Sequence, residues 1–274
     1  MKRTILGAAA ALTVLFSFGA DVALATFYSD TVQADGPILH YRLEEVGGAT
    51  VVDSSPTAAH GTYMGGVTLQ QPSFSLGLGS AAAFDGLSGW VDVPALGSFP
   101  QATVELWLNM AGNPAGGCCT SLYSTDSFST GNLHFNIKSG RDVEHAIASG
   151  GPNNINTPGG VIQSGVWYHV VGTYDTTAGG ATQIYVNGTS LANVPHAAAP
   201  LAALVDAQIA GWNGARYFGG AIDEFAIYDT ALSAAQVQAH FAAGSVVIPE
   251  PSCLVLAACA LAGFGLLMGR RRMR

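Results

Sequence analysis

Gln183-Ile184-Tyr185-Val186-Asn187-Gly188-Thr189-Ser190-Leu191 holds two short runs typical of β-strands on either side of an Asn-Gly pair. A type I′ turn needs positive φ at both central residues, and Asn-Gly meets that need well. The stretch therefore predicts an antiparallel hairpin. Asn187-Gly188-Thr189 also matches a glycosylation sequon, but the turn is the stronger interpretation.

Alternating segments of the same kind lie on both sides of this hairpin. Residues 103–108 alternate with period two, which places Val104, Leu106 and Leu108 on one face of a strand. Other strands are expected at residues 38–43, 133–137, 167–174 and 221–228.

One helix is expected, near the end of this region. Ser233 and Gln236 form a capping-box pattern, and Gly244 is placed to end a helix that runs from Ala234 to about Ala242. Many short strands with a single terminal helix predict an all-β fold, a two-sheet antiparallel jelly-roll sandwich.

The beginning of the chain reads as a targeting segment. Lys2 and Arg3 precede an apolar stretch that extends to about Phe18, and Ala23-Leu24-Ala25 is a small-x-small cleavage site. We expect a secretory signal peptide at residues 1–25, cleaved after Ala25. An uncleaved signal anchor is the alternative.

The end of the chain contains three signals in a fixed order: Pro249-Glu250-Pro251, the charge-free run Cys253–Met268, and a basic cluster at residues 270–274. The apolar run of 16 residues is slightly shorter than the roughly 17–25 that span a membrane as a helix. The arginines would keep the C-terminus in the cytoplasm. One interpretation is an ordinary membrane anchor.

All three parts of this tail match the PEP-CTERM sorting signal of bacterial envelope and matrix proteins, which the tail closely resembles. The resemblance implies recognition by an exosortase, cleavage near the Pro-Glu-Pro motif and transfer to an extracellular location. The chain thus divides into a signal peptide (1–25), one domain (26–244) and a sorting segment (245–274) with a transmembrane helix at 253–268.

The domain between the two ends is strongly acidic. Residues 26–248 contain four Lys or Arg against 16 Asp or Glu, a net charge of −12. Such a surface repels nucleic acid and anionic lipid, and it attracts divalent cations. We therefore expect no nucleic-acid partner.

A set of landmarks spread over residues 28–243 resembles the laminin-G-like, concanavalin A-like jelly roll of secreted bacterial proteins. The landmarks are Ala34-Asp35-Gly36-Pro37, Tyr41-Arg42-Leu43-Glu44-Glu45, Asp53-Ser54-Ser55, Gly61-Thr62-Tyr63, Ala83-Phe84-Asp85-Gly86, Thr103-Val104-Glu105-Leu106-Trp107, Trp167-Tyr168-His169-Val170, Tyr185-Val186-Asn187-Gly188, Gly220-Ala221-Ile222-Asp223-Glu224 and Ala231-Leu232-Ser233. The resemblance implies two antiparallel sheets, one of them concave, and often glycan binding and a structural Ca²⁺.

Asp223 is the first candidate for a metal ligand. Period two places it beside Phe225 and Ile227 on an apolar face, where a carboxylate is costly unless it is paired, hydrogen-bonded or metal-bound. Ca²⁺ prefers oxygen ligands. The family habit adds Asp85, Asp53 and Glu44 as co-ligands of a structural calcium. The alternative is that these carboxylates cap turns.

The tryptophans are candidates for stacking on sugar rings. Trp107 shares a strand face with Thr103 and Glu105, and Trp212 lies in the loop Gly211-Trp212-Asn213-Gly214. We take these two as the ligand-binding candidates, ahead of Trp90 and Trp167. The alternative for each is packing in the core.

Cys118 and Cys119 are neighbours in the expected exported domain. Export allows a disulfide, but neighbouring residues bond only through a strained ring, so two free thiols are an equal alternative.

Catalysis is not expected. Glycoside hydrolases of this jelly roll carry Glu-x-Asp-x-Glu carboxylates on one strand, and a pair of carboxylates is needed. The nearest match is Ala221-Ile222-Asp223-Glu224, in which Ala221 replaces the first Glu. No catalytic residue is predicted.

Together these features predict an exported cell-surface or matrix protein with a lectin-like domain for carbohydrate binding or adhesion. Expected partners are an exosortase-type enzyme, an extracellular polysaccharide, and the membrane through the C-terminal helix. A structural matrix protein without a discrete ligand is the main alternative, and an enzyme related to glycoside hydrolases is the third.

Overall fold

A computed structural model of the protein describes residues 28–113, 117–125, 127, 129–147, 154–177, 179–195 and 201–245. The expected signal peptide with its cleavage site at Ala25, the Pro249-Glu250-Pro251 motif and the apolar and basic tail all lie outside these residues. Within the described ranges, no helix is long and apolar enough to cross a membrane.

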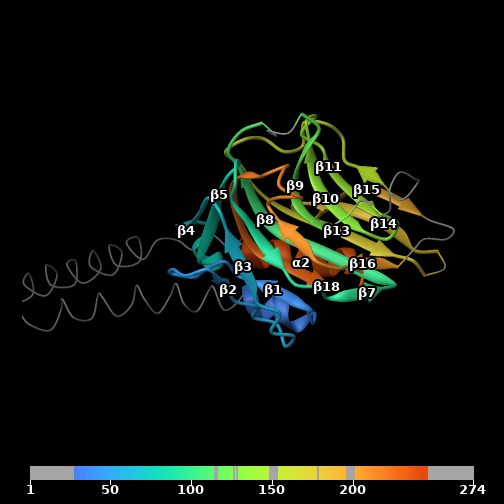
Figure 1. Ribbon diagram of the computed structural model, residues 1–274. Helices are drawn as coiled ribbons and strands as arrows, with labels where there is room; N and C mark the ends of the chain where they lie inside the picture. The colour runs from blue at the N-terminus through green and yellow to red at the C-terminus, as the bar shows by residue number, and fades with distance from the viewer. Residues whose placement is uncertain are drawn as a thin grey trace, which may run out of the picture.

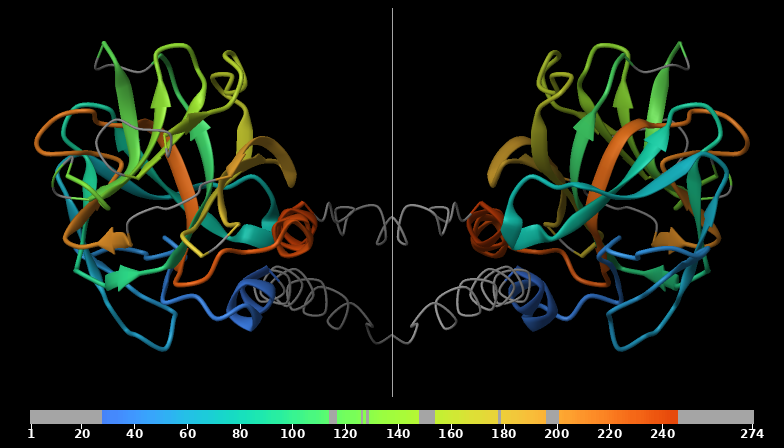
Figure 2. Two further views of the ribbon diagram at one scale, coloured as in Figure 1. Left: turned by 90° about the vertical axis from the view of Figure 1, so that its right-hand side faces the viewer. Right: turned by 90° about the vertical axis from the view of Figure 1, so that its left-hand side faces the viewer.

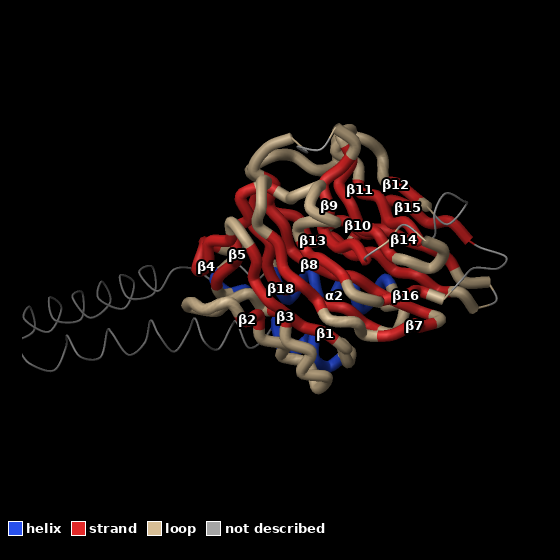
Figure 3. The backbone as a smooth tube through the Cα atoms, viewed as in Figure 1, coloured by secondary structure: helices blue, strands red, loops and turns tan. Residues whose placement is uncertain are grey.

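All but two of the described strands form two antiparallel sheets of eight strands each (Figures 1 and 3). Sheet A has the order β15-β14-β13-β8-β18-β5-β4, with β1 also paired to β18. Its strands are β1 (Leu39–Tyr41), β4 (Val67–Pro72), β5 (Ser80–Asp85), β8 (Gln101–Met110), β13 (Trp167–Asp175), β14 (Ala181–Val186), β15 (Thr189–Pro195) and β18 (Gly219–Tyr228).

Sheet B has the order β12-β11-β10-β9-β17-β6-β3-β2. Its strands are β2 (Thr50–Val51), β3 (Gly61–Met64), β6 (Trp90–Val93), β9 (Cys119–Thr125), β10 (Leu133–Lys138), β11 (Val143–Ile147), β12 (Ile155–Asn156) and β17 (Ala207–Ile209). A short pair, β7 (Gly97–Phe99) with β16 (Ala202–Leu204), and a 3₁₀ turn, η1 (Leu76–Leu78), complete the β region.

The hairpin predicted from the Asn-Gly pair is confirmed. β14 and β15 pair antiparallel with Val186 opposite Thr189, and Asn187 and Gly188 have φ values of 51° and 74°. Positive φ at both positions is the requirement of the two-residue turn.

The core lies between the two sheets. Side chains from alternate positions of both sheets fill it, such as Val104 and Leu106 from β8 and Phe135 from β10, all with 0% exposure. The all-β sandwich with one short C-terminal helix is therefore as predicted, whereas the helix at residues 28–34 was not predicted.

Two helices cover the outer face of sheet A, on the same side of the sandwich (Figure 2). One is α2 (Ala234–Gly244), and the other comprises residues 28–34. α2 begins with the predicted capping box between Ser233 and Gln236. The helices enclose a second apolar cluster that includes Tyr28 and Trp107. Both faces of sheet A are thus buried in its centre.

A β-bulge interrupts β18 at Asp223 and Glu224. Asp223 pairs with Trp107 and Ala226 pairs with Glu105, with a register shift between them, and Glu224 has φ 48°. Because directly opposed residues share a face, Asp223 lies with Trp107 on the helix-covered face. The prediction that Asp223 shares a face with Phe225 and Ile227 is wrong, because the bulge inserts one residue and reverses the alternation.

Candidate functional site

The outer face of sheet B is polar. Cross-strand partners run Thr62 to Asp92, Asp92 to Gln208, and Gln208 to Ser124. Their strand neighbours, such as Val91 and Ile209, point into the core. Because opposed residues share a face, the polar side chains form one continuous row on the outer side.

The 210–218 loop, which connects β17 to β18, presents an indole beside this row. Trp212 and Ala215 exchange two backbone hydrogen bonds of 2.9 Å around Asn213-Gly214. Asn213 and Gly214 have φ 50° and 71°, again the positive values that Asn-Gly turns favour. Trp212 is half-buried, while Asn213 and Gly214 are exposed. The sequence prediction of an exposed loop around Trp212 is confirmed.

Hydrogen bonds fix the loop to β9. The backbone amide of Ser121 donates to the Arg216 carbonyl at 2.8 Å, and the Thr120 hydroxyl donates to the Tyr217 carbonyl at 2.7 Å. The indole Nε1 of Trp212 donates to the carbonyl of Thr125 at 3.0 Å. The Trp212 indole and the backbone of the loop are therefore held in place before any ligand arrives, which reduces the entropy lost on binding.

Arg216 and His134 contact the indole ring of Trp212. The guanidinium carbon of Arg216 lies 4.4 Å from the Trp212 ring centroid, a cation–π contact. His134 meets Trp212 edge-on at 5.3 Å. Burial lowers the pKa of His134, so this imidazole is neutral at physiological pH. Arg216 is thus the cationic group that contacts this indole.

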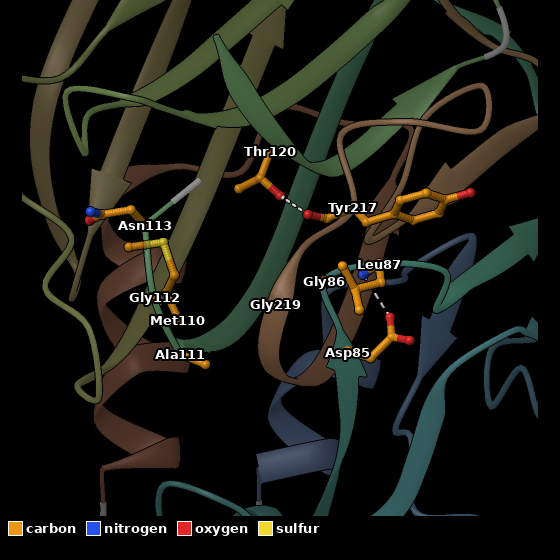
Figure 4. Close-up of a pocket in the computed structure, with 10 residues that line it drawn as sticks. All are labelled: Asp85, Gly86, Leu87, Met110, Ala111, Gly112, Asn113, Thr120, Tyr217 and Gly219. Carbon is orange, nitrogen blue, oxygen red and sulfur yellow. Dashed lines mark hydrogen bonds between the residues drawn. The ribbon is translucent and has the colours of Figure 1, made fainter. Parts of the chain in front are cut away.

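A hollow of about 300 Å³ lies on one side of the loop (Figure 4). Its lining comes from four parts of the chain, as Figure 4 shows: Asp85, Gly86 and Leu87; Met110, Ala111, Gly112 and Asn113; Thr120; Tyr217 and Gly219. Leu87 is 77% exposed at its rim. The size reaches the lower end of small-ligand sites, which measure about 300–1,000 Å³.

A smaller hollow of about 130 Å³ lies beside the same loop. Its lining combines two carboxylates, two amides and the indole: Asp92, Asp206, Ala207, Gln208, Trp212 and Asn213. Gln208 also accepts the Asn213 backbone amide at 2.9 Å. We call the loop, its two hollows and the neighbouring Trp90 the aromatic surface.

Trp107 does not belong to this surface. Its exposure is 0%, its indole donates to the Tyr28 hydroxyl at 3.1 Å, and Phe74 and Phe241 stack on it at 4.8 and 5.8 Å. The face chosen from the sequence is right, but the terminal helices and the segment around Phe74 cover it. Trp107 as a sugar-stacking residue is therefore a wrong prediction.

Two of the predicted calcium ligands organise turns. Asp53 accepts the backbone amides of His40, Ser55 and Ala59 at 2.8–2.9 Å. Asp85 accepts three backbone amides of residues 87–89 at 2.8–2.9 Å. These amides hold the pKa of Asp85 well below its usual range. The contacts of Asp53 and Asp85 are therefore those of carboxylates that cap turns, which is the alternative to calcium binding.

Asp223 and Glu44 lie elsewhere, near the bulge. Asp223 has 0% exposure and accepts hydrogen bonds from the Ser73 hydroxyl and the Glu224 amide. Burial and the neighbouring Glu224 raise its pKa. Glu44 accepts from Arg42 at 2.8 Å. Among the described residues, no group of three or more His, Cys, Asp or Glu side chains is placed to hold a metal ion.

Tyr217, Arg216, Asp92 and Gln208 were not selected from the sequence. Trp90-Val91-Asp92-Val93 alternates with period two, and that pattern alone places Trp90 and Asp92 together on a polar face. The positions of Arg216 and Tyr217 depend on how β9 holds the loop, and that of Gln208 depends on the pairing of β17 with β6 and β9. No local pattern reveals either.

Two antiparallel sheets packed face to face, with a polar, aromatic-bearing outer face, define a lectin-like jelly-roll sandwich. The sequence agrees with this architecture: the profile of the family Laminin_G_3, described as the concanavalin A-like lectin/glucanases superfamily, matches residues 84–238. The chain belongs to this family. Comparison with curated proteins found no match.

Solved structures share the fold at low sequence identity. Domain 4 of AbnA, an extracellular arabinanase from Geobacillus stearothermophilus solved with arabinotriose, is 19% identical with a TM-score of 0.55, covering 74% of this chain and 97% of that one. The binding domain of Paraclostridial Mosquitocidal Protein 1 is 15% identical with a TM-score of 0.59, covering 76% and 52%.

The structure of botulinum neurotoxin type C, described as dependent on two ganglioside molecules for cell entry, is 13% identical with a TM-score of 0.58 and covers 77% of this chain. The chain spans about half the length of these two toxin structures, 52% in each case. At such identities the likeness shows the fold alone.

Proposed function

We propose that this domain binds carbohydrate at the aromatic surface. The observation that carries the proposal is the 210–218 loop, which β9 holds. Half-buried Trp212 lines the smaller hollow together with Asp92 and Gln208 of the polar row, and half-buried Tyr217 lines the larger hollow. Flat apolar rings beside amide and carboxylate groups are the mixture that sugars need, because sugars present both C–H faces and hydroxyls. The family and the glycan-bound relatives support the same function.

Two substitutions test the proposal on the purified protein. A glycan array first selects the best ligand, and calorimetry then compares variants. Trp212→Ala and Tyr217→Ala are each expected to weaken the Kd about 10- to 100-fold, because an aromatic anchor contributes about 1.5–3 kcal/mol.

The matched control is Trp167→Ala, which removes a half-buried tryptophan from β13 in the opposite sheet. It should bind as wild type does. Unchanged affinity in both loop variants would place binding elsewhere and refute the aromatic surface.

A structural matrix role without a discrete ligand is the alternative function. It predicts no signal on the array for acidic or neutral polysaccharides, with or without calcium. A family-related hydrolase is the weaker alternative, and we propose that the domain is not an enzyme. Asp223 and Glu224 both have 0% exposure, so in this conformation a glycosidic bond does not reach the carboxylates on β18.

Structural calcium stays a prediction, with Asp223 as its first ligand. Calorimetric titration of the protein with CaCl₂ tests it, alongside the melting temperature. Heat that disappears in Asp223→Asn would support the site, while absence of both heat and thermal shift would exclude it.

Export and sorting are proposals that rest on the two ends of the sequence. We expect the mature chain to begin near Thr26 and to be processed near Pro249-Glu250-Pro251. Mass spectrometry of cell fractions tests both ends. Mature protein that retains residues 270–274 would indicate an ordinary membrane anchor instead.

A further inference from the structure

Cys118 and Cys119 bring two thiols together where the chain enters β9. The two Sγ atoms lie 2.7 Å apart, and both cysteines are free. Their backbone is held on the neighbouring strand, since the Ser139 amide donates to the Cys118 carbonyl at 2.9 Å and Cys119 pairs with Lys138. The two sulfur atoms therefore lie side by side on an ordered strand.

The two thiols differ in access to solvent. Cys118 is exposed, whereas Cys119 is 1% exposed. Burial, together with the hydrogen bond to Cys118, raises the pKa of the Cys119 thiol to about 12. Because the thiolate is the reactive form, an external reagent meets Cys118 first, and Cys119 reacts only with its neighbour.

We propose that Cys118 and Cys119 form a reversible redox site that closes to a disulfide between adjacent residues. The oxidant is a disulfide of a small thiol, such as glutathione disulfide. The Cys118 thiolate attacks one sulfur of the reagent and releases one thiolate, which leaves a mixed disulfide on Cys118. Cys119 then attacks the Cys118 sulfur and releases the second thiolate. Two electrons pass to the reagent, and the two thiol protons pass to the two released thiolates.

Reversibility follows from covalent geometry. Adjacent Cα atoms are about 3.8 Å apart across a trans peptide, which is less than the about 4.4–6.8 Å usual for disulfides. Strained and exposed disulfides have the more oxidising potentials of labile bonds. The site does not depend on carbohydrate binding, although Thr120 and Ser121, the next residues of β9, hold the 210–218 loop.

The test uses the full-length protein with Cys253→Ser and Cys259→Ser, so that Cys118 and Cys119 are the remaining cysteines. The protein is incubated with glutathione disulfide, alkylated, digested and measured by mass spectrometry. We expect the peptide that contains both cysteines to lose two hydrogen atoms and to escape alkylation. Dithiothreitol should restore two alkylation sites.

Two single variants separate the roles of the thiols. Cys119→Ser should accumulate the mixed disulfide on Cys118, because no thiol remains to displace glutathione. Cys118→Ser should leave Cys119 reduced and slow to alkylate. The proposal is overturned if the parent protein keeps two free thiols after oxidation, or if it forms dimers linked through Cys118. It is also overturned if Cys118→Ser takes up glutathione as readily as Cys119→Ser does.

Discussion

Glu105 is a carboxylate at the centre of the helix-covered face, with 0% exposure. It accepts hydrogen bonds from His169 at 2.7 Å, Tyr228 at 2.9 Å and His240 at 3.0 Å. The Tyr28 hydroxyl points to it at 3.4 Å. Burial alone would raise the pKa of Glu105, but the neighbouring histidines outweigh burial and hold it well below its usual range. The carboxylate therefore joins both terminal helices to the sheet.

Glu105→Gln should lower the free energy of unfolding by about 2–4 kcal/mol, because it leaves buried donors and an imidazolium without their anionic partner. Urea denaturation measures the loss. Asp229→Asn, at an exposed position after β18, is the control and should change stability by less than about 0.5 kcal/mol. Equal stability of Glu105→Gln and wild type would contradict the structural role of this carboxylate.

His240 gives the same face a dependence on pH. Burial lowers its pKa, but Glu105 and Asp35 raise it more, and the net shift is upward. Asp35 accepts from His240 Nε2 at 2.9 Å, and the Tyr228 ring lies 6.2 Å away. The native state therefore holds its proton more tightly than the unfolded chain does.

A raised native pKa stabilises the fold fully below the unfolded pKa of about 6.5, and this stabilisation is lost as the pH rises through the native value. Asp223, whose pKa is also raised, acts in the same direction. His134 and His145, whose pKa values burial lowers, act in the opposite direction below about pH 6.5. Above that pH we expect the stability of the wild type to fall with rising pH more steeply than that of His240→Gln. A variant with an unchanged slope in urea titrations would refute the assignment to His240.

Gly244, at the end of α2, shows how one element is fitted to another. An added Cβ would lie 2.5 Å from Cζ2 of Trp107 and 3.2 Å from Cδ2 of Tyr28. Glycine here permits the close approach of α2 to the sheet and to the helix at residues 28–34. The sequence predicted that the helix would run to about Ala242 and that Gly244 would stop it, but α2 includes Gly244 and its C-cap is Ser245. The role that the structure gives Gly244 is packing.

Gly244→Ala should therefore destabilise the protein by about 1–3 kcal/mol, the usual effect of overpacking, although Ala elsewhere in a helix stabilises by up to about 1 kcal/mol. Gly47→Ala is the control, since nothing lies within 4 Å of the added Cβ. Thermal unfolding distinguishes the two. A rise in Tm for Gly244→Ala would show that α2 has room to shift.

Elements set by local rules were predictable, while those set by contacts distant in sequence were not. The hairpin at Asn187-Gly188 and the capping box at Ser233 depend on residues within a few positions, and both are as predicted. The bulge at Glu224 depends on how β18 pairs with β8. The burial of Trp107 depends on segments from both ends of the domain. The alternation of residues in β8 predicts on which face of the strand Trp107 lies, but only the tertiary structure shows which segments cover that face.

For the whole molecule, the net charge can be predicted from the sequence, whereas the positions of the charges depend on the fold. The sequence gives a domain with a net charge of −12, but only the fold shows where its few cations lie. Arg42 pairs with Glu44, Lys138 pairs with Glu144, and Arg216 lies over Trp212. The aromatic surface was predictable only in part, through Trp212 and its loop, because its other members come from β6, β17 and the start of β18.

The contact between Tyr28 and Gly244 predicts tolerance of a new chain order. A short Gly-Ser linker from Ser245 to Tyr28, with new ends between Gly47 and Gly48 in an exposed loop, should fold with the wild-type circular dichroism spectrum. Domains with adjacent ends usually accept such permutation. An insoluble permutant would contradict this, provided that wild type with an insertion of the same linker at Gly47 is soluble.

The same contact has a consequence for presentation. The described chain enters and leaves the domain at neighbouring points on the helix-covered side (Figure 2). Trp212 and the polar row lie on the outer face of the other sheet. If the domain is attached through either end of the described chain, the attachment point lies on the helix-covered side. The 210–218 loop therefore faces away from both ends of the described chain, where a ligand in solution can reach it.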